Sequence, residues 1–448
     1  MISWAARNVI FPLHELIVGR RTRAFVGLLE RSQWDAPQAL RALQGRKLRA
    51  LLVHASRHVP YYAELIRGVG ADPLVDDPFA LLSALPLTDK AKIREAGTRI
   101  CWNGCPGGLH ASNTGGSTGQ PLQFYTDRRR QAYDQAARIR VHRWFGIEFG
   151  QTEAYLWGSP IEGAGSGWVK RFRDRLFNHV LLNAFDMSPE RMRVYLRLLT
   201  RMRPTSIFGY PSSLALLAKF GKAESISLGG VSPKAVFVTG ELCYPHHRKV
   251  IGDYFGAPVA DGYGSREAGF IAHECPHGGM HITSENVIVE ILEAARPVVA
   301  GACGEIVVTH LDAYGMPFIR YATGDRGRLA PGRCVCGRGL ALMDGIQGRT
   351  TDFIYLPDGT IKHALSVIYP LRAMRGVRQF MVTQKQDYAV TVDLVVDSVH
   401  GRATSEEVVR RLRPVLGPTV DVRVNLVERI APARSGKFRY VVSQAGGG

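Results

Sequence analysis

The strongest constraint on the fold is an alternation of short β-rich runs with helical runs between about residues 105 and 345. Such alternation is typical of layered α/β folds with a largely parallel sheet. Two runs of alternating apolar and polar residues follow, at 281–292 and 304–311, and predict a more antiparallel subdomain. The clearest α/β section is a strand at 205–209, a helix at 212–219, a strand at 235–238, a helix entered at Pro245 and a strand at 257–260.

The two ends of the chain have different patterns. Residues 1 to about 100 carry apolar positions every three or four residues, which predicts a helical lead-in. After residue 350 the sequence predicts a hairpin at 380–383 and 389–396, a helix capped at Thr404 and a strand at 420–426. We therefore expect an α/β protein with a large N-terminal domain, residues 1–349, and a small, mobile α+β C-terminal domain, residues 350–448.

The chain is strongly basic, with 57 Lys and Arg against 39 Asp and Glu and a formal net charge of +18. Such a field attracts nucleotides, nucleic acid or an anionic membrane face. Because no basic stripe interleaved with aromatic residues and no nucleic-acid motif is present, we expect no nucleic-acid partner. Peripheral association with an anionic surface is compatible with the charge. The densest basic run, 127–130, opens a predicted helix that continues to Trp144, and we expect it to form a solvated helix face.

Cysteine usage and the absence of long apolar runs bear on the compartment. Seven cysteines are too few and too scattered for a disulfide framework, which favours a reducing cytoplasm. No run of roughly 18 apolar residues occurs, and the first residues do not form a signal peptide. We therefore expect a cytoplasmic protein without a transmembrane segment.

Four motifs carry the chemistry of a nucleotide site. The loop Ser112-Asn113-Thr114-Gly115-Gly116-Ser117-Thr118-Gly119 has the composition of a phosphate-binding loop, or of a flexible turn. The segment 261–267 places a ring, small residues and one carboxylate just past a predicted strand end, where open α/β sheets bind ligands. Residues 320–325 put an aspartate beside a glycine turn, suited to ribose hydroxyls. Residues 435–437 place a lysine in a loop of small residues near the end of the chain.

In this order and spacing the motifs resemble those of the adenylate-forming superfamily of acyl-CoA synthetases, adenylation domains and luciferases. The phenylacetate–CoA ligase branch, with its capsule-biosynthesis relatives, is the most similar. The resemblance covers nearly the whole chain and includes residues 48–62, the phrase Leu-Pro-Leu-Thr-Asp-Lys at 85–90 and residues 208–212.

The resemblance implies ATP-dependent activation of a carboxylic acid as an acyl-adenylate, with release of pyrophosphate, followed by acyl transfer to coenzyme A. It implies that Glu267 holds magnesium, that Lys437 is a mobile catalytic cation and that Arg349 lies at the hinge. The remaining roles it implies are phosphate binding by Thr114, Gly115, Gly116, Ser117, Thr118 and Gly119, adenine binding by Gly240, Glu241 and Tyr263, other nucleotide contacts by Gly264 and Ser265, and ribose binding by Asp325.

The chain departs from the family pattern in three places. Gln120 stands where the phosphate loop usually has lysine, so one cation is missing. At the hinge, Thr351 stands where aspartate is usual. Residues 356–360 lack the glycine-rich phrase of typical CoA ligases, so thioester formation is less well supported than adenylation. An adenylyl- or amide-forming transferase with an amine or other acceptor, and a degenerate nucleotide-binding protein, are the alternatives; the acid and the oligomeric state stay undetermined.

Two short clusters of cysteine and histidine form a second constellation. Cys275 lies six residues before His281, and Cys334 and Cys336 form a Cys-x-Cys knuckle followed by glycine. Thiolate and imidazole ligands in two such clusters suit tetrahedral zinc. We expect these four residues to hold a structural zinc ion, with His277 and His273 as the alternatives to His281.

Overall fold

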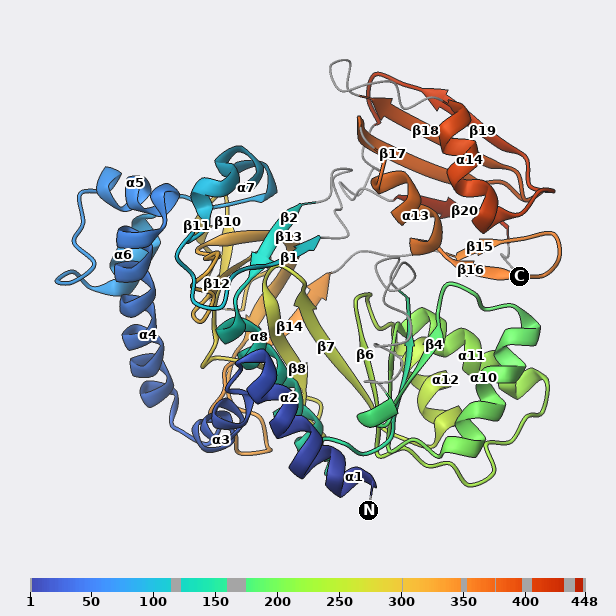
Figure 1. Ribbon diagram of the computed structural model, residues 1–448, viewed down its shortest axis with the longest axis horizontal. Helices are drawn as coiled ribbons and strands as arrows, with labels where there is room; N and C mark the ends of the chain where they lie inside the picture. Colours follow the sequence, from blue (N-terminus) through green and yellow to red (C-terminus); the bar gives the residue numbers. More distant parts are fainter. Residues whose placement is uncertain are drawn as a thin grey trace. The chain divides into compact units, whose positions relative to one another are not determined.

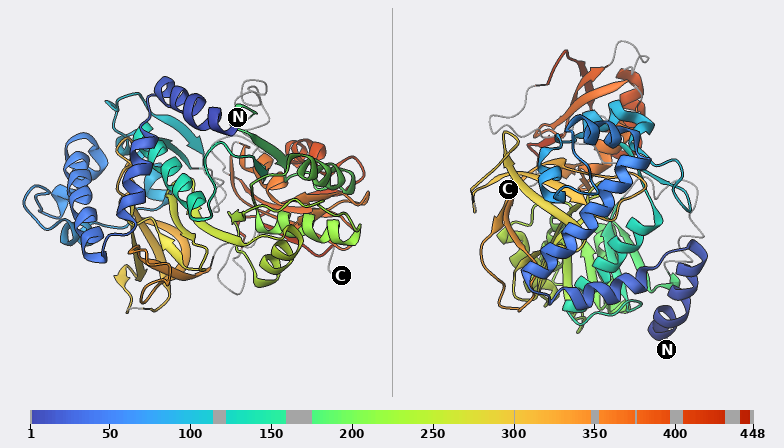
Figure 2. Two further views of the ribbon diagram at one scale, coloured as in Figure 1. Left: turned by 90° about the horizontal axis from the view of Figure 1, so that it is seen from below. Right: turned by 90° about the vertical axis from the view of Figure 1, so that its left-hand side faces the viewer.

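The computed structural model describes residues 2–113, 122–158, 175–299, 301–347, 353–374, 376–396, 405–430 and 440–445 (Figures 1 and 2). The chain divides into two compact units. Unit 1 comprises residues 1–114, 122–150 and 260–348, and unit 2 comprises residues 115–121, 151–259 and 349–448. Both units combine helices with a sheet, so the predicted α/β class is confirmed.

Unit 1 begins with the helical lead-in that the apolar spacing predicts. Proline, which has no N–H to leave unpaired, is the first residue of α4, α5 and α6, and the Asp89 and Asp127 side chains cap α7 and α8. No described helix is both long and apolar enough to cross a membrane. The helical elements are α1 (Ile2–Ala5), the π-helical turn η1 (Ala6–Ile10), α2 (Phe11–Val18), α3 (Thr22–Ser32), α4 (Pro37–His58), α5 (Pro60–Gly68), α6 (Pro78–Ala84), α7 (Lys90–Ala96), the 3-10 turn η2 (Gly97–Ile100) and α8 (Arg128–Trp144).

The strands of unit 1 confirm the predicted antiparallel subdomain. They run in the order β11-β10-β12-β13-β14-β9-β8-β7, and every neighbouring pair is antiparallel. The run expected as one strand at 281–292 is two strands, because the buried residues 283–286 turn the chain between them. The strands are β7 (Val259–Ser265), β8 (Gly269–Glu274), β9 (Met280–Ile282), β10 (Val287–Glu293), β11 (Arg296–Pro297), β12 (Gly304–His310), β13 (Tyr321–Ala330) and β14 (Leu342–Gln347), beside the two-stranded ribbon β1 (His110–Asn113) and β2 (Gln123–Thr126).

Unit 2 contains the predicted parallel α/β section. Strands β6-β5-β3-β4 lie in that order and pair in parallel. Leu199 of α10, Leu217 of α11 and Phe255 of α12 pack in one core with Ile207 and Val236 of the strands. The elements are β3 (Glu153–Trp157), β4 (His179–Asn183), α10 (Pro189–Met202), β5 (Ser206–Gly209), α11 (Pro211–Ala223), β6 (Ala235–Thr239) and α12 (Pro245–Phe255).

The last hundred residues form a small α+β fold with its own core. The predicted hairpin, helix and strand are present as β17, β18, α14 and β19, whereas β15, β16, α13 and β20 were not predicted. The sheet order is β19-β18-β17-β20, with β17 and β18 antiparallel. The predicted boundary at residue 349 lies outside the described residues and stays a prediction. The elements are β15 (Phe353–Tyr355), β16 (Ile361–His363), α13 (Leu365–Arg372), β17 (Val377–Gln384), β18 (Val390–Val396), α14 (Ser405–Leu416), β19 (Val422–Leu426) and β20 (Val441–Ser443).

Candidate active site and metal centre

Glu267 is a buried carboxylate in the turn between β7 and β8, only 6% exposed. Its Oε1 accepts a hydrogen bond from the Tyr321 hydroxyl at 3.0 Å and lies 3.1 Å from Lys90 Nζ. Burial by itself would raise the pKa of this carboxyl, but Lys90 and the hydrogen bonds prevail and lower the pKa below its usual value. Glu267 is therefore ionised at neutral pH and paired with one cation.

Lys90 reaches Glu267 because the phrase at 85–90 is tied to the start of β13. Thr88 forms a parallel bridge with Tyr321, and its N–H donates to the Arg320 carbonyl at 2.9 Å. Asp89 then caps α7, so the helix begins at Lys90 itself. Sequence reasoning did not select Lys90 as a site residue. Two features of the sequence could have indicated Lys90. It ends the motif at 85–90 that the family resemblance already includes, and Gln120 replaces the usual lysine of the phosphate loop, so another cation is needed.

Gly264 and Ser265 shape the turn that carries Glu267. A Cβ on Gly264 would lie 2.5 Å from the Gly269 carbonyl oxygen, so only glycine fits there. The Ser265 hydroxyl accepts a hydrogen bond from the Ala268 N–H at 2.9 Å. The turn was expected just past a strand end, but β7 continues to Ser265 because residues 262–265 pair with β8.

Arg130 of α8 contacts the backbone of the same turn. Its Nη2 donates to the Arg266 carbonyl at 2.8 Å, and its side chain is 1% exposed. Arg140, ten residues later in the same helix, also has a side chain that is 1% exposed, and it forms an ion pair with Glu285 at 2.6 Å. The expectation of a solvated face for the basic run was therefore wrong in part: Arg129 is half exposed, but Arg130 is enclosed because it satisfies a backbone carbonyl at the site.

Tyr263 and Asp325, both expected to contact nucleotide, lie together. The Tyr263 hydroxyl donates to Asp325 Oδ2 at 3.1 Å, and the Asp325 N–H donates to the Thr323 hydroxyl at 3.1 Å. Asp325 lies within strand β13 rather than in a turn, although the preceding Gly324 has a φ of +78°. Strands β7 and β13 thus supply one pair of predicted nucleotide contacts.

Gly240 and Glu241 belong to unit 2 and follow strand β6. Gly240 has a φ of +83°, and a Cβ there would lie 3.2 Å from the Tyr210 ring, which explains the glycine. Glu241 Oε2 accepts hydrogen bonds from the N–H, at 3.2 Å, and from the hydroxyl of Ser212. The Tyr210 ring stacks on Trp157 with ring centroids 4.0 Å apart.

The other predicted site residues lie outside the described residues. They are the phosphate loop Thr114, Gly115, Gly116, Ser117, Thr118 and Gly119, the hinge Arg349 and the mobile cation Lys437. Strand β1 ends at Asn113, directly before the loop. The roles expected of these residues stay predictions.

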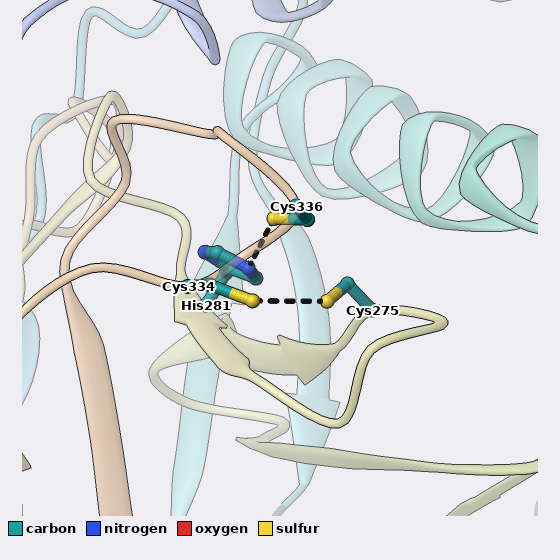
Figure 3. A group of neighbouring side chains, drawn as sticks. All are labelled: Cys275, His281, Cys334 and Cys336. Carbon is teal, nitrogen blue, oxygen red and sulfur yellow. Dashed lines mark hydrogen bonds between the residues drawn. The ribbon is translucent and has the colours of Figure 1, made fainter.

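The cysteine and histidine clusters meet in unit 1. One ligand atom from each of Cys275, His281, Cys334 and Cys336 lies within 4.8 Å of all the others (Figure 3). Cys275 follows β8, His281 lies in β9, and the two remaining cysteines lie between β13 and β14. His273 stacks on Phe270 with ring centroids 4.7 Å apart, and neither it nor His277 belongs to the group.

Two separations within this group lie near those of a tetrahedral zinc site. Bond lengths of ~2.3 Å to sulfur and ~2.0 Å to nitrogen place two ligand sulfurs about 3.8 Å apart and sulfur and nitrogen about 3.5 Å apart. The Cys275 and Cys334 sulfurs are 3.6 Å apart, and Cys336 Sγ lies 3.2 Å from His281 Nε2. The cysteines are not joined as disulfides. The donor set and these two separations therefore suit a tetrahedral metal ion such as zinc.

Backbone turns position the cysteine ligands, and burial together with a nearby positive charge keeps the histidine ligand neutral. The Gly278 N–H donates to the Cys275 carbonyl at 2.9 Å, and the Gly337 N–H donates to the Cys334 carbonyl at 3.1 Å, which folds each cluster back on itself. Burial, followed by the charge of Arg338, lowers the pKa of His281 to about 4, so its imidazole is neutral and able to bind a metal.

Sequence relatives extend over most of the chain. A family model described as the CapK C-terminal domain matches residues 354–444. Protein CapK of Staphylococcus aureus is 22% identical over 414 residues, which cover 90% of this chain and 88% of CapK. Phenylacetate-coenzyme A ligase of Escherichia coli is 29% identical over 345 residues, covering 71% of this chain and 72% of the ligase, and its Thermus thermophilus namesake is 26% identical over 329 residues, covering 71% and 72%.

A solved structure shares the fold. The 2-hydroxyisobutyryl-CoA ligase in complex with 2-HIB-AMP and CoA superposes with a TM-score of 0.63 at 20% identity, covering 92% of each chain. That likeness establishes the architecture of a large sheet followed by a small C-terminal sheet domain. Over most of its length the chain is therefore similar to CapK and to phenylacetate–coenzyme A ligases, and it shares the fold of an adenylate-forming ligase.

Proposed function

We propose that this enzyme uses ATP to activate a carboxylic acid as an acyl-adenylate and then transfers the acyl group, with coenzyme A as the first candidate acceptor. One observation carries the proposal: β7 with its turn and β13 together supply two adjoining pairs, Tyr263 with Asp325 and Glu267 with Tyr321. The first pair suits a nucleoside and the second pair anchors a carboxylate suited to magnesium. Relatives named phenylacetate-coenzyme A ligase support this reading.

The proposed chemistry has two steps. A carboxylate oxygen of the acid attacks the α-phosphorus of ATP, the bond between that phosphorus and the bridging oxygen breaks, and pyrophosphate leaves. The acceptor thiol then attacks the acyl carbonyl, and AMP leaves as the thioester forms. Both steps bring anions together, so the protein must supply positive charge where negative charge develops.

Lys90 is our candidate for part of that charge. Its side chain is 12% exposed and pairs with the Glu267 carboxylate. A triphosphate offers Lys90 a further anionic partner, and Glu267 is then available to hold magnesium through a charged oxygen. Magnesium, when bound, neutralises phosphate oxygens. Lys90 would thereby compensate for Gln120 in the phosphate loop.

We propose that the second constellation binds zinc in a structural role. Three thiolates and one imidazole complete a four-ligand shell with no position left for water or substrate. Such an ion ties the turn between β8 and β9 to the connection between β13 and β14. The bound zinc ion would stabilise the folded state and take no part in the reaction.

A different acceptor is the second candidate. The match to CapK covers 90% of the chain, whereas the matches to phenylacetate-coenzyme A ligases cover 71–74%, and the C-terminal region fits the CapK family model. Because residues 356–360 lack the glycine-rich phrase of typical CoA ligases, an amine or another nucleophile is the second candidate acceptor.

Pyrophosphate release tests the first step and product analysis tests the second. The protein is incubated with ATP, magnesium and a panel of aryl, short-chain and sugar acids, and pyrophosphate is measured for each acid. We expect release that depends on one acid class. Mass spectrometry with coenzyme A or with amines then identifies the product: an acyl-CoA supports the first candidate, and an amide supports the second. An enzyme that binds ATP but releases no pyrophosphate with any acid would contradict the proposal.

A further inference from the structure

The N-terminal helix presents a row of large apolar side chains to solvent. Elements α1, η1 and α2 follow one another without a break over residues 2–18. In Figures 1 and 2 this helix lies at the periphery of unit 1. We define its N-terminal apolar face by the five exposed side chains, which are Trp4 (62% exposed), Val9 (51%), Leu13 (55%), Leu16 (78%) and Ile17 (75%).

The opposite side of the helix is fixed to unit 1. Ala6, Phe11 and Glu15 are buried, and the Phe11 ring lies 4.2 Å from the Phe149 ring. Glu15 Oε1 accepts a hydrogen bond from Arg20 at 2.7 Å. These contacts set the rotation of the helix about its axis, so the apolar face points outward because of packing rather than fraying.

The π-helical turn brings the first two apolar residues into line. In a regular α-helix, residues five apart differ by roughly 140° around the axis, so Trp4 and Val9 would point apart. Over η1 the Phe11 N–H donates to the Ala6 carbonyl five residues earlier. Because a π-helical turn contains more residues than an α-helical one, the angle between Trp4 and Val9 around the helix axis is smaller than in a regular α-helix. Beyond it, Val9, Leu13 and Ile17 recur at the four-residue spacing of one helix face.

The exposed charge of the N-terminal segment itself is positive. Among residues 2–24 the sole acid is Glu15, which is buried and paired. Arg21 and Arg23 are exposed directly after the helix, whereas Arg7 on the helix pairs with Glu148 at 3.4 Å. The helix thus has an apolar face, exposed arginines after it and no exposed carboxylate of its own, and it complements a surface with an apolar interior and negatively charged headgroups.

We propose that the N-terminal apolar face docks on an anionic lipid bilayer, with the helix in the plane of the interface. The five side chains enter the boundary between headgroups and acyl chains, where tryptophan is favoured, and the arginines meet lipid phosphates. Apart from the indole of Trp4, the side chains of this face carry no hydrogen-bonding group, which suits the acyl boundary of a bilayer. The inference does not depend on the proposed reaction.

Vesicle co-sedimentation of the full chain tests the apolar contribution. Wild-type protein is mixed with vesicles of phosphatidylcholine and phosphatidylglycerol, or of phosphatidylcholine alone. We expect binding to the anionic vesicles, and about a tenfold or greater loss of affinity for the double variant Leu16→Asp/Ile17→Asp, because charge cannot enter the acyl region. The matched control is Leu74→Asp/Val75→Asp, an equally exposed apolar pair at 58% and 76% with the same charge change, which should bind like wild type.

Two further measurements test the contribution of the arginines to membrane binding and the possibility that a second copy of the chain covers the N-terminal apolar face. Arg21→Gln/Arg23→Gln should weaken binding to anionic vesicles, and added salt should weaken wild-type binding. Unchanged thermal unfolding shows that the variants are folded. Three results would overturn the proposal: no binding of wild type to anionic vesicles, equal binding of the Leu16→Asp/Ile17→Asp variant, or wild-type self-association in sedimentation velocity that this variant abolishes, since a second copy would then cover the face.

Discussion

Lys90 Nζ lies 3.1 Å from Oε1 of Glu267, and the Tyr321 hydroxyl donates to the same oxygen. The lysine comes from the start of α7, the carboxylate from the turn after β7 and the tyrosine from the start of β13. Three segments far apart in the sequence therefore converge on one carboxylate oxygen. This convergence links the phrase at 85–90 to the proposed magnesium ligand and motivates three of the predictions.

Replacement of Lys90 by alanine should slow carboxylate-dependent pyrophosphate exchange by roughly 10²-fold, because a cation placed at developing phosphate charge is removed. Lys90→Arg should recover part of the rate. Lys92→Ala, an exposed lysine on the same helix, is the matched control and should behave like wild type. Near-normal exchange by Lys90→Ala would remove Lys90 from the proposed mechanism.

Glu267→Gln should lower the exchange rate and raise the magnesium concentration needed for half-maximal rate, because a neutral amide is a poor ligand for a hard cation. A magnesium titration of the exchange rate measures both. Tyr321→Phe keeps the carboxylate and removes one hydrogen bond, so it should cost about 1 kcal/mol of stability and leave the magnesium dependence in place. An identical titration for Glu267→Gln and wild type would exclude Glu267 as the ligand.

The same carboxylate predicts a pH dependence of stability. The folded-state pKa of Glu267 lies below its usual value of about 4.3, so ionised Glu267 stabilises the fold at neutral pH. That contribution is lost as the pH falls through the folded-state pKa. The difference in Tm between wild type and Glu267→Gln should therefore be constant above about pH 5 and shrink below about pH 4. Calorimetry of both proteins across this range checks the prediction, which a pH-independent difference would contradict.

Lys437→Ala should reduce adenylation by roughly 10²-fold or more, because a cation that reaches the nucleotide only in the closed state acts on the transition state. ATP binding to the open form should change little, which calorimetric titration can check. Lys385→Ala, an exposed lysine in the turn between β17 and β18, serves as the control within the same domain. If Lys437→Ala retained normal pyrophosphate exchange, the assignment of the terminal domain would be wrong.

Cys334→Ser should release zinc and lower the Tm or the soluble yield, because the four-ligand shell loses a thiolate. Any folded variant should retain part of the adenylation activity. Cys303→Ser, at an exposed cysteine outside the group, should leave zinc content and Tm unchanged. Metal analysis of reduced protein made without a histidine tag decides the matter: much less than one zinc per chain in wild type would rule out the site. A variant that kept fold and zinc but lost all activity would argue for a catalytic role.

The sequence by itself determined most of the architecture. Apolar periodicity located the helical lead-in, the strand and helix alternation of unit 2, and the hairpin, helix and strand of the C-terminal region, because period and burial are local properties of the chain. It also selected the four residues of the metal group, since Cys275, His281 and the Cys-x-Cys knuckle carry their chemistry in short spacings. The additional elements β15, β16 and α13 were not predicted, because these short segments near residue 360 have no sustained periodicity of apolar residues.

Tertiary structure decided which of these residues meet. Nothing in the spacing of residues 85–90 indicates that Lys90 reaches Glu267; the bridge between Thr88 and Tyr321 brings it there. Arg130 reads as a solvated arginine in sequence and is enclosed in the fold, because the Arg266 carbonyl in a distant turn needs its guanidinium. Sequence patterns report how each segment partitions between water and core, whereas the partner of a buried charge depends on the packing of segments that only the folded chain brings together.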